Sequence, residues 1–210
     1  MSKLRAKKIK LILFDVDGVL TDGKIWIFPS PAGVETPPAS GSPTQTLLER
    51  SAQQAGQPGS GAHVATLIEA KGFHAHDGTG ISLARLAGIK TGLITKRNSE
   101  TVALRARDLK IDHVHQGIQD KAGVFQQILE KDGITPAEAA FVGDDVIDLP
   151  VMRKCGLAIA VKNARPEVKA EAHWVTPHAG GDGAARDAIE HILKAQGTWK
   201  KAVGDYIGEG

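Results

Sequence analysis

The stretch that decides the fold is the apolar run Ile9–Phe14, Ile-Lys-Leu-Ile-Leu-Phe, which leads directly into Asp15–Gly23, Asp-Val-Asp-Gly-Val-Leu-Thr-Asp-Gly. An almost continuous apolar run of this length predicts a strand buried on both faces, as in a parallel sheet. Asp15 and Asp17 would then stand at the carboxyl end of that strand. Ligands bind at this edge in open α/β sheets. The pattern therefore indicates a functional site at the two carboxylates.

An Asp-x-Asp-Gly sequence has other interpretations. A tight turn uses Asp and Gly for its backbone geometry alone, and at this point that alternative stays open. A calcium-binding loop needs an oxygen ligand at its fifth position and a Glu at its twelfth, where this chain has Val19 and Trp26. The calcium loop is therefore excluded. A site for a hard cation and phosphate is left, with one Asp as ligand or nucleophile and the other as acid or base.

The composition is that of an ordinary globular protein. The 210 residues suffice for one substantial core, and although 41% are hydrophobic, no apolar stretch approaches the roughly 18 residues of a membrane span. The formal net charge is only +2, and the basic start Met1–Lys10 lacks aromatic residues. We expect a solvated lead-in there, and no nucleic-acid or membrane partner. The single cysteine, Cys155, excludes an internal disulfide framework and favours a cytoplasmic location.

Downstream of the first strand, helical and strand-like segments alternate. The expected helices lie near 79–87, 98–110, 120–132, 146–155, 165–172 and 183–195, and the expected strands at 90–94, 111–115, 139–142, 157–161 and 173–176. Repeating β–α units of this length predict a parallel sheet with helices on both faces. The predicted fold class is therefore α/β, a Rossmann-like three-layer sandwich with a mostly parallel sheet, in which residues 1–210 form a single domain.

The segment between the first strand and the first long helix is irregular. Apolar residues at Lys24–Phe28 and Val64–Phe73 predict a hairpin, so the expected flap spans 24–73. Between these strands, the insertion 29–62 holds six of the ten prolines of the chain. A mobile expanded tip with a helical turn or two around 46–54 and a disordered linker both fit this composition. No large cap domain is expected.

Three further polar clusters follow predicted strands. Thr95 and Arg97 come after the strand at 90–94. Lys121 lies in a first helical turn, where a cation opposes the helix dipole and a bound anion would explain it. The last cluster consists of Asp144, Asp145 and Asp148. These carboxylates would repel one another without a divalent cation. Four clusters at successive strand ends predict an active site rather than a set of turns.

In this order the clusters resemble the four motifs of the haloacid dehalogenase superfamily of phosphotransferases: Asp-x-Asp, Thr or Ser, Lys, and Gly-Asp-x-x-x-Asp. More narrowly, the chain resembles the 3-deoxy-D-manno-octulosonate 8-phosphate phosphatases, over nearly everything except 29–62. Further matching segments are Asp77–Ile81, Ile94–Arg97, Gly117–Lys121, Gly143–Asp148 and Gly180–Arg186. The resemblance implies hydrolysis of that sugar-acid phosphate in lipopolysaccharide precursor synthesis. A nonulosonate 9-phosphate is the alternative substrate.

The residues themselves suggest the chemistry. In-line attack on a phosphate monoester needs a nucleophile, a proton donor and cations that offset the charge on the phosphoryl oxygens. We expect Asp15 to be the nucleophile that forms an aspartyl-phosphate, and Asp17 to be the general acid and then the general base. The cofactor is expected to be Mg²⁺, held by Asp15, the main-chain carbonyl of Asp17 and Asp144.

The remaining predicted site residues support these groups. Thr95 and Lys121 are expected to bind phosphoryl oxygens that the metal does not reach. Asp145 and Asp148 are expected to orient a metal-bound water and Lys121 from behind the direct ligands.

The resemblance also implies how substrate is selected. In relatives of this kind a short hairpin flap and a neighbouring subunit close the site in a homotetramer. The residues expected to contact the sugar acid are Glu69, Lys71, His76 and Arg97, and a substrate carboxylate would favour the cations among them. His74 and His76 are expected on one strand face, as surface histidines or as ligands. The tail 197–210 is expected either to reach a neighbouring active site or to fray into solvent.

Two other functional classes share part of this pattern. A receiver-type signalling domain also uses a phosphoacceptor Asp, a Thr, a Lys and paired acids, but it has no second Asp two residues after the phosphoacceptor, which argues against it here. A non-catalytic oligomerisation or regulatory module of the same fold would not need all the predicted catalytic groups that this chain retains.

Overall fold

The computed structural model describes residues 1–29 and 67–209. Six parallel strands form the main sheet in the order β5-β4-β1-β6-β7-β8. Their bounds are β1 Leu11–Phe14, β4 Lys90–Ile94, β5 His113–His115, β6 Ala139–Gly143, β7 Leu157–Ala160 and β8 Trp174–Val175. The predicted α/β class with a mostly parallel sheet is confirmed.

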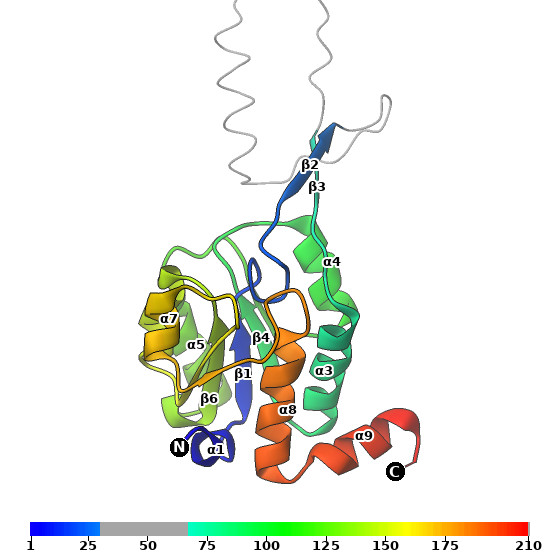
Figure 1. Cartoon of the computed structure of the whole chain (residues 1–210), viewed down its shortest axis with the longest axis vertical. Coiled ribbons are helices and arrows are strands. Elements are labelled where there is room, and N and C mark those ends of the chain that lie inside the picture. Colours follow the sequence, from blue (N-terminus) through cyan, green and yellow to red (C-terminus); the bar gives the residue numbers. More distant parts are fainter. Residues whose placement is uncertain (30–66, 210) are drawn as a thin grey trace, which may run out of the picture.

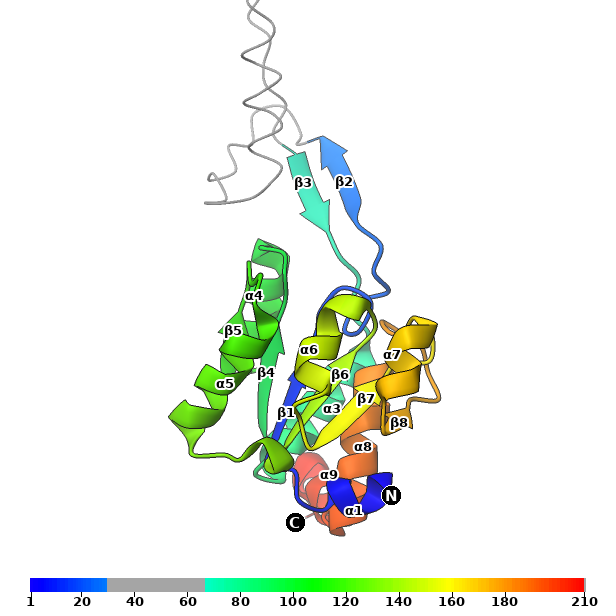
Figure 2. The same cartoon turned by 90° about the vertical axis from the view of Figure 1, so that its left-hand side faces the viewer.

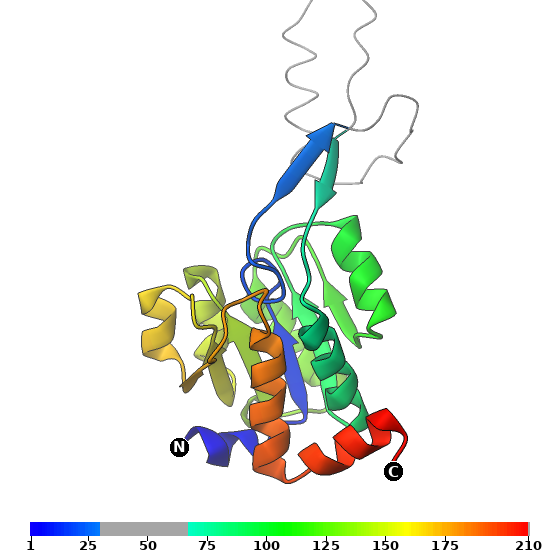
Figure 3. The ribbon, with the colours of Figure 1, turned by 45° about the vertical axis from the view of Figure 1, so that its right-hand side comes forward.

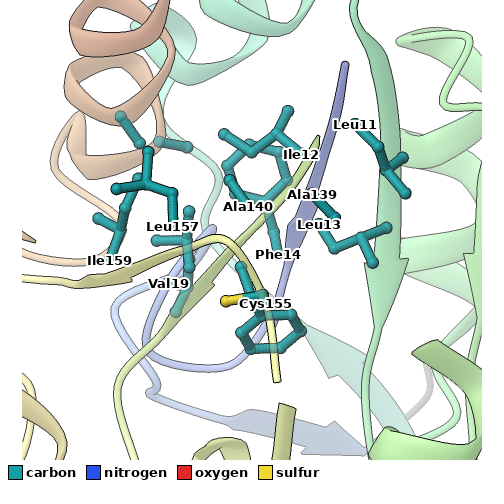
Figure 4. Close-up of a cluster of buried hydrophobic side chains, with 14 of the residues drawn as sticks. Leu11, Ile12, Leu13, Phe14, Val19, Ala139, Ala140, Cys155, Leu157 and Ile159 are labelled. Carbon is teal, nitrogen blue, oxygen red and sulfur yellow. The ribbon is translucent and has the colours of Figure 1, made fainter. Parts of the chain in front are cut away.

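Strand β1 lies at the centre of this sheet because its side chains are apolar on both faces. It pairs with β4 on one side and with β6 on the other, and all four of its residues are buried. Figure 4 shows the packing of β1 against β6, β7 and Val19. A strand of this kind has no polar face to present to water. The first residue after β1, Asp15, therefore reaches the carboxyl edge of the sheet while it is still buried, with 3% of its surface exposed.

Helices cover both faces of the sheet. Helices α3 (Ala75–Leu86) and α8 (Ala184–Gln196) pack together on one face. Helices α5 (Lys121–Asp132), α6 (Leu149–Met152) and α7 (Pro166–Glu171) cover the other, as Figure 2 shows, and α4 (Glu100–Asp108) connects β4 to β5. The buried face of α8 includes three alanines, whose small side chains permit close approach to α3. The predicted three-layer sandwich is confirmed.

A two-stranded hairpin projects beyond the carboxyl edge of the sheet. Strand β2 (Trp26–Pro29) pairs antiparallel with β3 (Leu67–Ala70), and Figures 1 and 3 show both strands standing clear of the helices. All four residues of β2 are exposed. Beyond Pro29 the predicted insertion lies outside the described residues, as does the helical turn predicted around 46–54.

Several predicted boundaries were wrong. Met1–Lys10 is not only a solvated lead-in, because Ser2–Ala6 form helix α1, whose Ala6 is buried. The amide of Gln196 on α8 donates hydrogen bonds to the carbonyls of Ala6 and Ile9, at 3.2 and 2.7 Å. This long-range contact explains an ordered start that composition alone did not predict.

The segment after β3 and the acidic segment after β6 also differ from prediction. His74 and His76 do not share a strand face, since β3 ends at Ala70 and His74 is the N-cap of α3. The helix predicted at 146–155 is a single 3₁₀ turn, Val146–Asp148, followed by the short α6. Carboxylates at both ends of that turn accept backbone N–H bonds, a local alternative to a regular α-helical start.

The tail is a helix rather than a frayed end. Helix α9 (Trp199–Ile207) packs against α3, and the ring of Trp199 lies 5.0 Å from the guanidinium of Arg186 and 5.2 Å from the ammonium of Lys194. Figure 3 shows α9 at the opposite end of the molecule from the hairpin. In the described part of the chain, no helix combines the length and apolarity of a bilayer span.

Candidate active site

The carboxyl ends of three adjacent strands bring the predicted motifs together. Phe14 of β1 pairs with Leu93 of β4 on one side and with Val142 of β6 on the other. The residues that follow these strands, Asp15, Thr95 and Asp144, therefore emerge side by side at one edge of the sheet. Their convergence is a consequence of parallel pairing, as the sequence predicted.

A buried lysine joins two of the carboxylates. The Lys121 ammonium lies 2.8 Å from Asp15 Oδ2 and 2.8 Å from Asp148 Oδ1, and its side chain is 3% exposed. Lys121 is the first residue of α5, so its charge opposes the helix dipole. Two ion pairs outweigh that small effect. Desolvation lowers the pKa of Lys121, but the charges and hydrogen bonds of Asp15 and Asp148 outweigh desolvation and raise this pKa above its usual value. Lys121 is therefore a fixed cation.

Asp148 organises this cluster from beneath. Its Oδ1 accepts the hydrogen bond from Lys121, and its Oδ2 accepts one from the backbone N–H of Asp144 at 3.0 Å. Both oxygens of this fully buried carboxylate are thus engaged within the protein. This geometry suits the predicted role of Asp148 in orienting Lys121.

Three carboxylates lie close enough together to hold a metal ion. One oxygen each from Asp15, Asp144 and Asp148 lie within 4.8 Å of one another. The Oδ1 atom of Asp144 is buried without a hydrogen-bond partner. Buried polar atoms are normally paired, so an unpartnered carboxylate oxygen at this place fits a cation ligand. Hydrogen bonding thus favours Asp144 as a direct ligand, since both oxygens of Asp15 and both oxygens of Asp148 already have partners within the protein. The ligand role of Asp15 stays a prediction.

Electrostatics point to the same conclusion. Burial raises the pKa of Asp15 to about 6, with the charge of Asp148 adding to the effect and Lys121 opposing it. Burial and the neighbouring Asp148, Asp15 and Asp145 raise the pKa of Asp144 to about 7. Three ionised carboxylates against one ammonium leave two uncompensated negative charges. A divalent oxygen-seeking cation would compensate them and keep both acids ionised.

Asp17 faces a different group of residues, at the base of the hairpin. The Lys71 ammonium, on a fully buried side chain, forms an ion pair with Asp17 Oδ1. Lys71 also lies 3.7 Å from Glu69, whose Oε2 accepts a hydrogen bond from Arg97 at 3.0 Å. Desolvation would raise the pKa of Glu69, but the bond from Arg97 and the two cations hold that pKa below its ordinary value. The structure thus places Glu69, Lys71 and Arg97 around Asp17.

The remaining predicted residues have different surroundings. Thr95 is buried beside β1, where its backbone pairs with His115 and Ile118. Asp145 is exposed, and its Oδ1 accepts a hydrogen bond from Val146 N–H at 2.7 Å rather than one from Lys121. His76 is exposed on the first turn of α3, with its ring 4.8 Å from that of His74. The substrate role of His76 and the orienting role of Asp145 stay predictions.

Sequence reasoning did not identify the glycines that pack around these carboxylates. A β-carbon on Gly18 would overlap the carboxylate of Asp144, and one on Gly180 would overlap the carbonyl of Gly18. Both glycines lie within the matching segments, but the sequence alone predicts no role for them. A signal was present in the pair Gly180-Gly181, because paired glycines outside a regular element often mark close approach of two backbones.

Comparisons with known proteins agree with this geometry. A family model described as haloacid dehalogenase-like hydrolase matches residues 85–187. The 3-deoxy-D-manno-octulosonate 8-phosphate phosphatase of Escherichia coli strain K12 is 36% identical over 203 residues, which cover 97% of this chain and 89% of the relative.

Two solved structures of such phosphatases are also similar. The enzyme from Moraxella catarrhalis, in complex with magnesium, phosphate and KDO, has a TM-score of 0.75 and 31% identity, covering 97% of each chain. The cobalt-bound enzyme from Haemophilus influenzae has a TM-score of 0.70 and 30% identity, covering 92% of each chain.

Proposed function

Because the chain belongs to the haloacid dehalogenase-like hydrolases, and within them to the 3-deoxy-D-manno-octulosonate 8-phosphate phosphatases, we propose that it hydrolyses this phosphate monoester to the free sugar acid and phosphate. The observation that carries the proposal is the buried cluster of Asp15, Asp144, Asp148 and Lys121 at the carboxyl end of β1. The proposed reaction of this protein supplies a precursor of lipopolysaccharide.

Asp15 is the proposed nucleophile. Its Oδ1 accepts a hydrogen bond from Val16 N–H at 2.6 Å, and its Oδ2 lies against Lys121. These contacts hold the carboxylate at one orientation. Attack of an Asp15 oxygen on phosphorus breaks the bond to the sugar oxygen and leaves an aspartyl-phosphate, which water then hydrolyses. Lys121 offsets negative charge on the phosphoryl oxygens throughout.

Asp17 is the proposed acid and base. Its Oδ1 pairs with Lys71, so the proton that it donates to the departing sugar oxygen in the first step is carried on Oδ2, and the resulting carboxylate takes a proton from water in the second step. The ion pair with Lys71 fixes the position of the Asp17 carboxylate, and Lys71 is itself immobilised by burial. Thr95 is proposed to donate a hydrogen bond to a phosphoryl oxygen from the end of β4.

The cofactor is Mg²⁺, for which the oxygen ligands and the net charge of the cluster are suited. Asp15, Asp144 and the main-chain carbonyl of Asp17 would hold it. When bound, Mg²⁺ supplies charge stabilisation to the transferring phosphoryl group.

Substrate selection is assigned to the base of the hairpin. Lys71 and Arg97 are the cations there, and both are partly neutralised by Glu69 and Asp17. A sugar-acid carboxylate would pair with Arg97, whose planar guanidinium suits bidentate contact. Neutral sugar phosphates lack that group.

Phosphate release from a panel of substrates tests this function. With Mg²⁺ present, kcat/KM for 3-deoxy-D-manno-octulosonate 8-phosphate should exceed that for hexose phosphates by on the order of 100-fold, the effect of one lost charge-assisted contact pair. A nonulosonate 9-phosphate included in the panel tests the alternative sugar acid. A flat profile would contradict the sugar-acid assignment, and no hydrolysis of any ester would contradict the phosphatase assignment.

We further propose that the protein is a homotetramer assembled through the hairpin. Three apolar side chains on β2 are about half exposed, with Trp26 at 54%, Ile27 at 55% and Phe28 at 49%, and Ile68 on β3 is 36% exposed. Successive side chains of a strand point to opposite faces, so both faces of this two-stranded ribbon expose apolar side chains, which favours their burial against other copies. A neighbouring hairpin or tail would then help to close the site.

The free, buried Cys155 also fits the proposed cytoplasmic location.

Sedimentation velocity checks the assembly. The wild type should sediment as a tetramer, and Phe28→Lys should dissociate it, because a lysine in an apolar interface is left without a partner. Leu104→Lys on α4 is the matched control, since Leu104 is 50% exposed but lies outside the hairpin. A monomeric wild type, or equal dissociation of both variants, would contradict the hairpin assembly.

A further inference from the structure

The loop 178–183, between β8 and α8, lies directly against the loop that follows β1. Gly181 N–H donates a hydrogen bond to the carbonyl of Val19 at 3.0 Å, and Gly180 N–H donates one to Asn163 Oδ1 at 2.8 Å. The approach is so close that a β-carbon on Gly180 would overlap the carbonyl group of Gly18. No side chain other than hydrogen fits at this position without moving one of the two backbones.

Gly18 in turn contacts a proposed metal ligand. A β-carbon on Gly18 would overlap the carboxylate of Asp144, and the φ of Gly18 is +91°, a conformation that favours glycine. Gly18 therefore contacts Gly180 through its carbonyl group and Asp144 through its α-carbon. The three residues form a continuous stack from the loop 178–183 to the metal-binding cluster.

The far end of the loop is anchored by a buried carboxylate from another helix. Asp77 on α3 is 3% exposed, and its Oδ1 accepts a hydrogen bond from Arg186 N–H at 2.8 Å. The N-cap of α8 is Gly183, which has no side chain to cap the helix. Asp77, which lies 109 residues before Arg186 in the sequence, caps α8 instead. The loop is thus held by Asn163, by Val19 and, through α8, by Asp77.

We propose that Gly180 is a positioning residue for the metal site, which acts through Gly18 to set the place of the Asp144 carboxylate. This inference rests on the proposed Mg²⁺-dependent phosphatase function. Close packing transmits displacement because protein interiors contain few voids. An added methyl group at 180 would push the Gly18 peptide and shift a ligand by a fraction of an ångström, enough to weaken coordination of a cation as exacting in its geometry as Mg²⁺.

Isothermal titration calorimetry of Mg²⁺ binding to the full chain, without substrate, tests the positioning role of Gly180 directly. Gly180→Ala should raise the dissociation constant for Mg²⁺ by about 10-fold or more. This is the size of effect typical when a residue that contacts a metal ligand is disturbed. Gly204→Ala is the matched control: nothing lies within 4 Å of a β-carbon there, and neither glycine has a positive φ. Its Mg²⁺ affinity should equal that of the wild type.

A second pair of variants covers the case in which Gly180→Ala does not fold. Asp77→Ala removes the cap of α8 and adds no atoms, so it should weaken Mg²⁺ binding by loosening the loop. Asp77→Asn keeps an acceptor oxygen for Arg186 N–H and should restore the affinity to within about 3-fold. A general loss of stability would affect both Asp77 variants without this difference in Mg²⁺ affinity.

The outcomes separate this inference from the proposed function. Wild-type Mg²⁺ affinity in folded Gly180→Ala would overturn it. If Gly180→Ala does not fold, equal Mg²⁺ affinities of Asp77→Ala and the wild type would overturn it. Failure of the wild type to release phosphate from any substrate would instead contradict the phosphatase function, while the comparison of Mg²⁺ affinities would still decide the role of Gly180.

Discussion

Asp15→Asn should abolish turnover while leaving the fold intact. Amide oxygen is a poor nucleophile, so no aspartyl-phosphate can form, and kcat should fall by on the order of 10⁴-fold or more, as when the nucleophile of other covalent mechanisms is removed. Phosphate release under saturating substrate and Mg²⁺ measures the effect.

The free energy of unfolding of Asp15→Asn should stay close to that of the wild type, although its activity is lost. The raised pKa of Asp15, about 6, means that burial and the charge of Asp148 disfavour its ionised form more than Lys121 favours it. Asparagine removes that unfavourable charge, but it also removes the ion pair with Lys121 and one of the two acceptor oxygens. Because these effects oppose each other, the free energy of unfolding without Mg²⁺ should stay within about 1 kcal/mol of that of the wild type. Urea denaturation checks this.

Asp22→Asn is the control for the same loop. The side chain of Asp22 is 44% exposed and pairs with Lys24. This variant should keep wild-type activity, because Asp22 is absent from the buried cluster. Full activity of Asp15→Asn would refute the covalent mechanism, and an unfolded Asp15→Asn would refute the electrostatic account of the site.

Lys121→Met should have the second-largest effect, and it should act on both stability and rate. Removing the ammonium leaves Asp15 and Asp148 buried without their common counter-charge. Breaking a buried ion pair from one side destabilises by about 3–5 kcal/mol. Without metal, urea unfolding should show a loss of this order, and kcat should fall because the phosphoryl oxygens lose a fixed cation.

Mg²⁺ should restore part of the stability of Lys121→Met, since it replaces one missing positive charge, but not kcat. The control is Lys10→Met, because Lys10 is 66% exposed and pairs with Glu138 at 2.6 Å. An exposed pair of this kind contributes about 0–1 kcal/mol. Similar losses of stability in Lys10→Met and Lys121→Met would contradict the importance of burial at the site.

Local patterns explain why so much of the sheet and its edge was predictable. The apolar run ending at Phe14 can be satisfied only by burial on both faces, and parallel pairing then brings the segments after β1, β4 and β6 to one edge. Parallel pairing therefore predicts from the sequence that Asp15, Thr95 and Asp144 lie together. The parallel sheet follows from this periodicity, whereas the motifs follow from the polar residues at the strand ends and from their resemblance to those of the haloacid dehalogenase superfamily.

Elements whose order depends on distant partners were not predictable in this way. Helix α1 is held by a hydrogen bond from Gln196, and α9 packs against α3. Because composition does not reveal such partners, it predicts only a solvated lead-in for the first segment and either a frayed end or contact with a neighbouring site for the second. The strand-like run from Val64 to Phe73 predicts that His74 continues a strand, although Gly72 is a possible local stop signal. The position of His74 as the N-cap of α3 became clear only in the folded chain.

By itself the sequence determined the α/β fold, because the fold depends on local apolar patterning. It also determined the family and the identity of the carboxylates and the lysine, because these depend on short motifs that can be read along the chain. Only the tertiary structure decided how these groups divide their contacts. It engages both oxygens of Asp148, leaves an oxygen of Asp144 without a partner, and encloses Gly18 between Asp144 and Gly180. The contacts of Gly18 join segments more than a hundred residues apart, and only close packing in three dimensions specifies them.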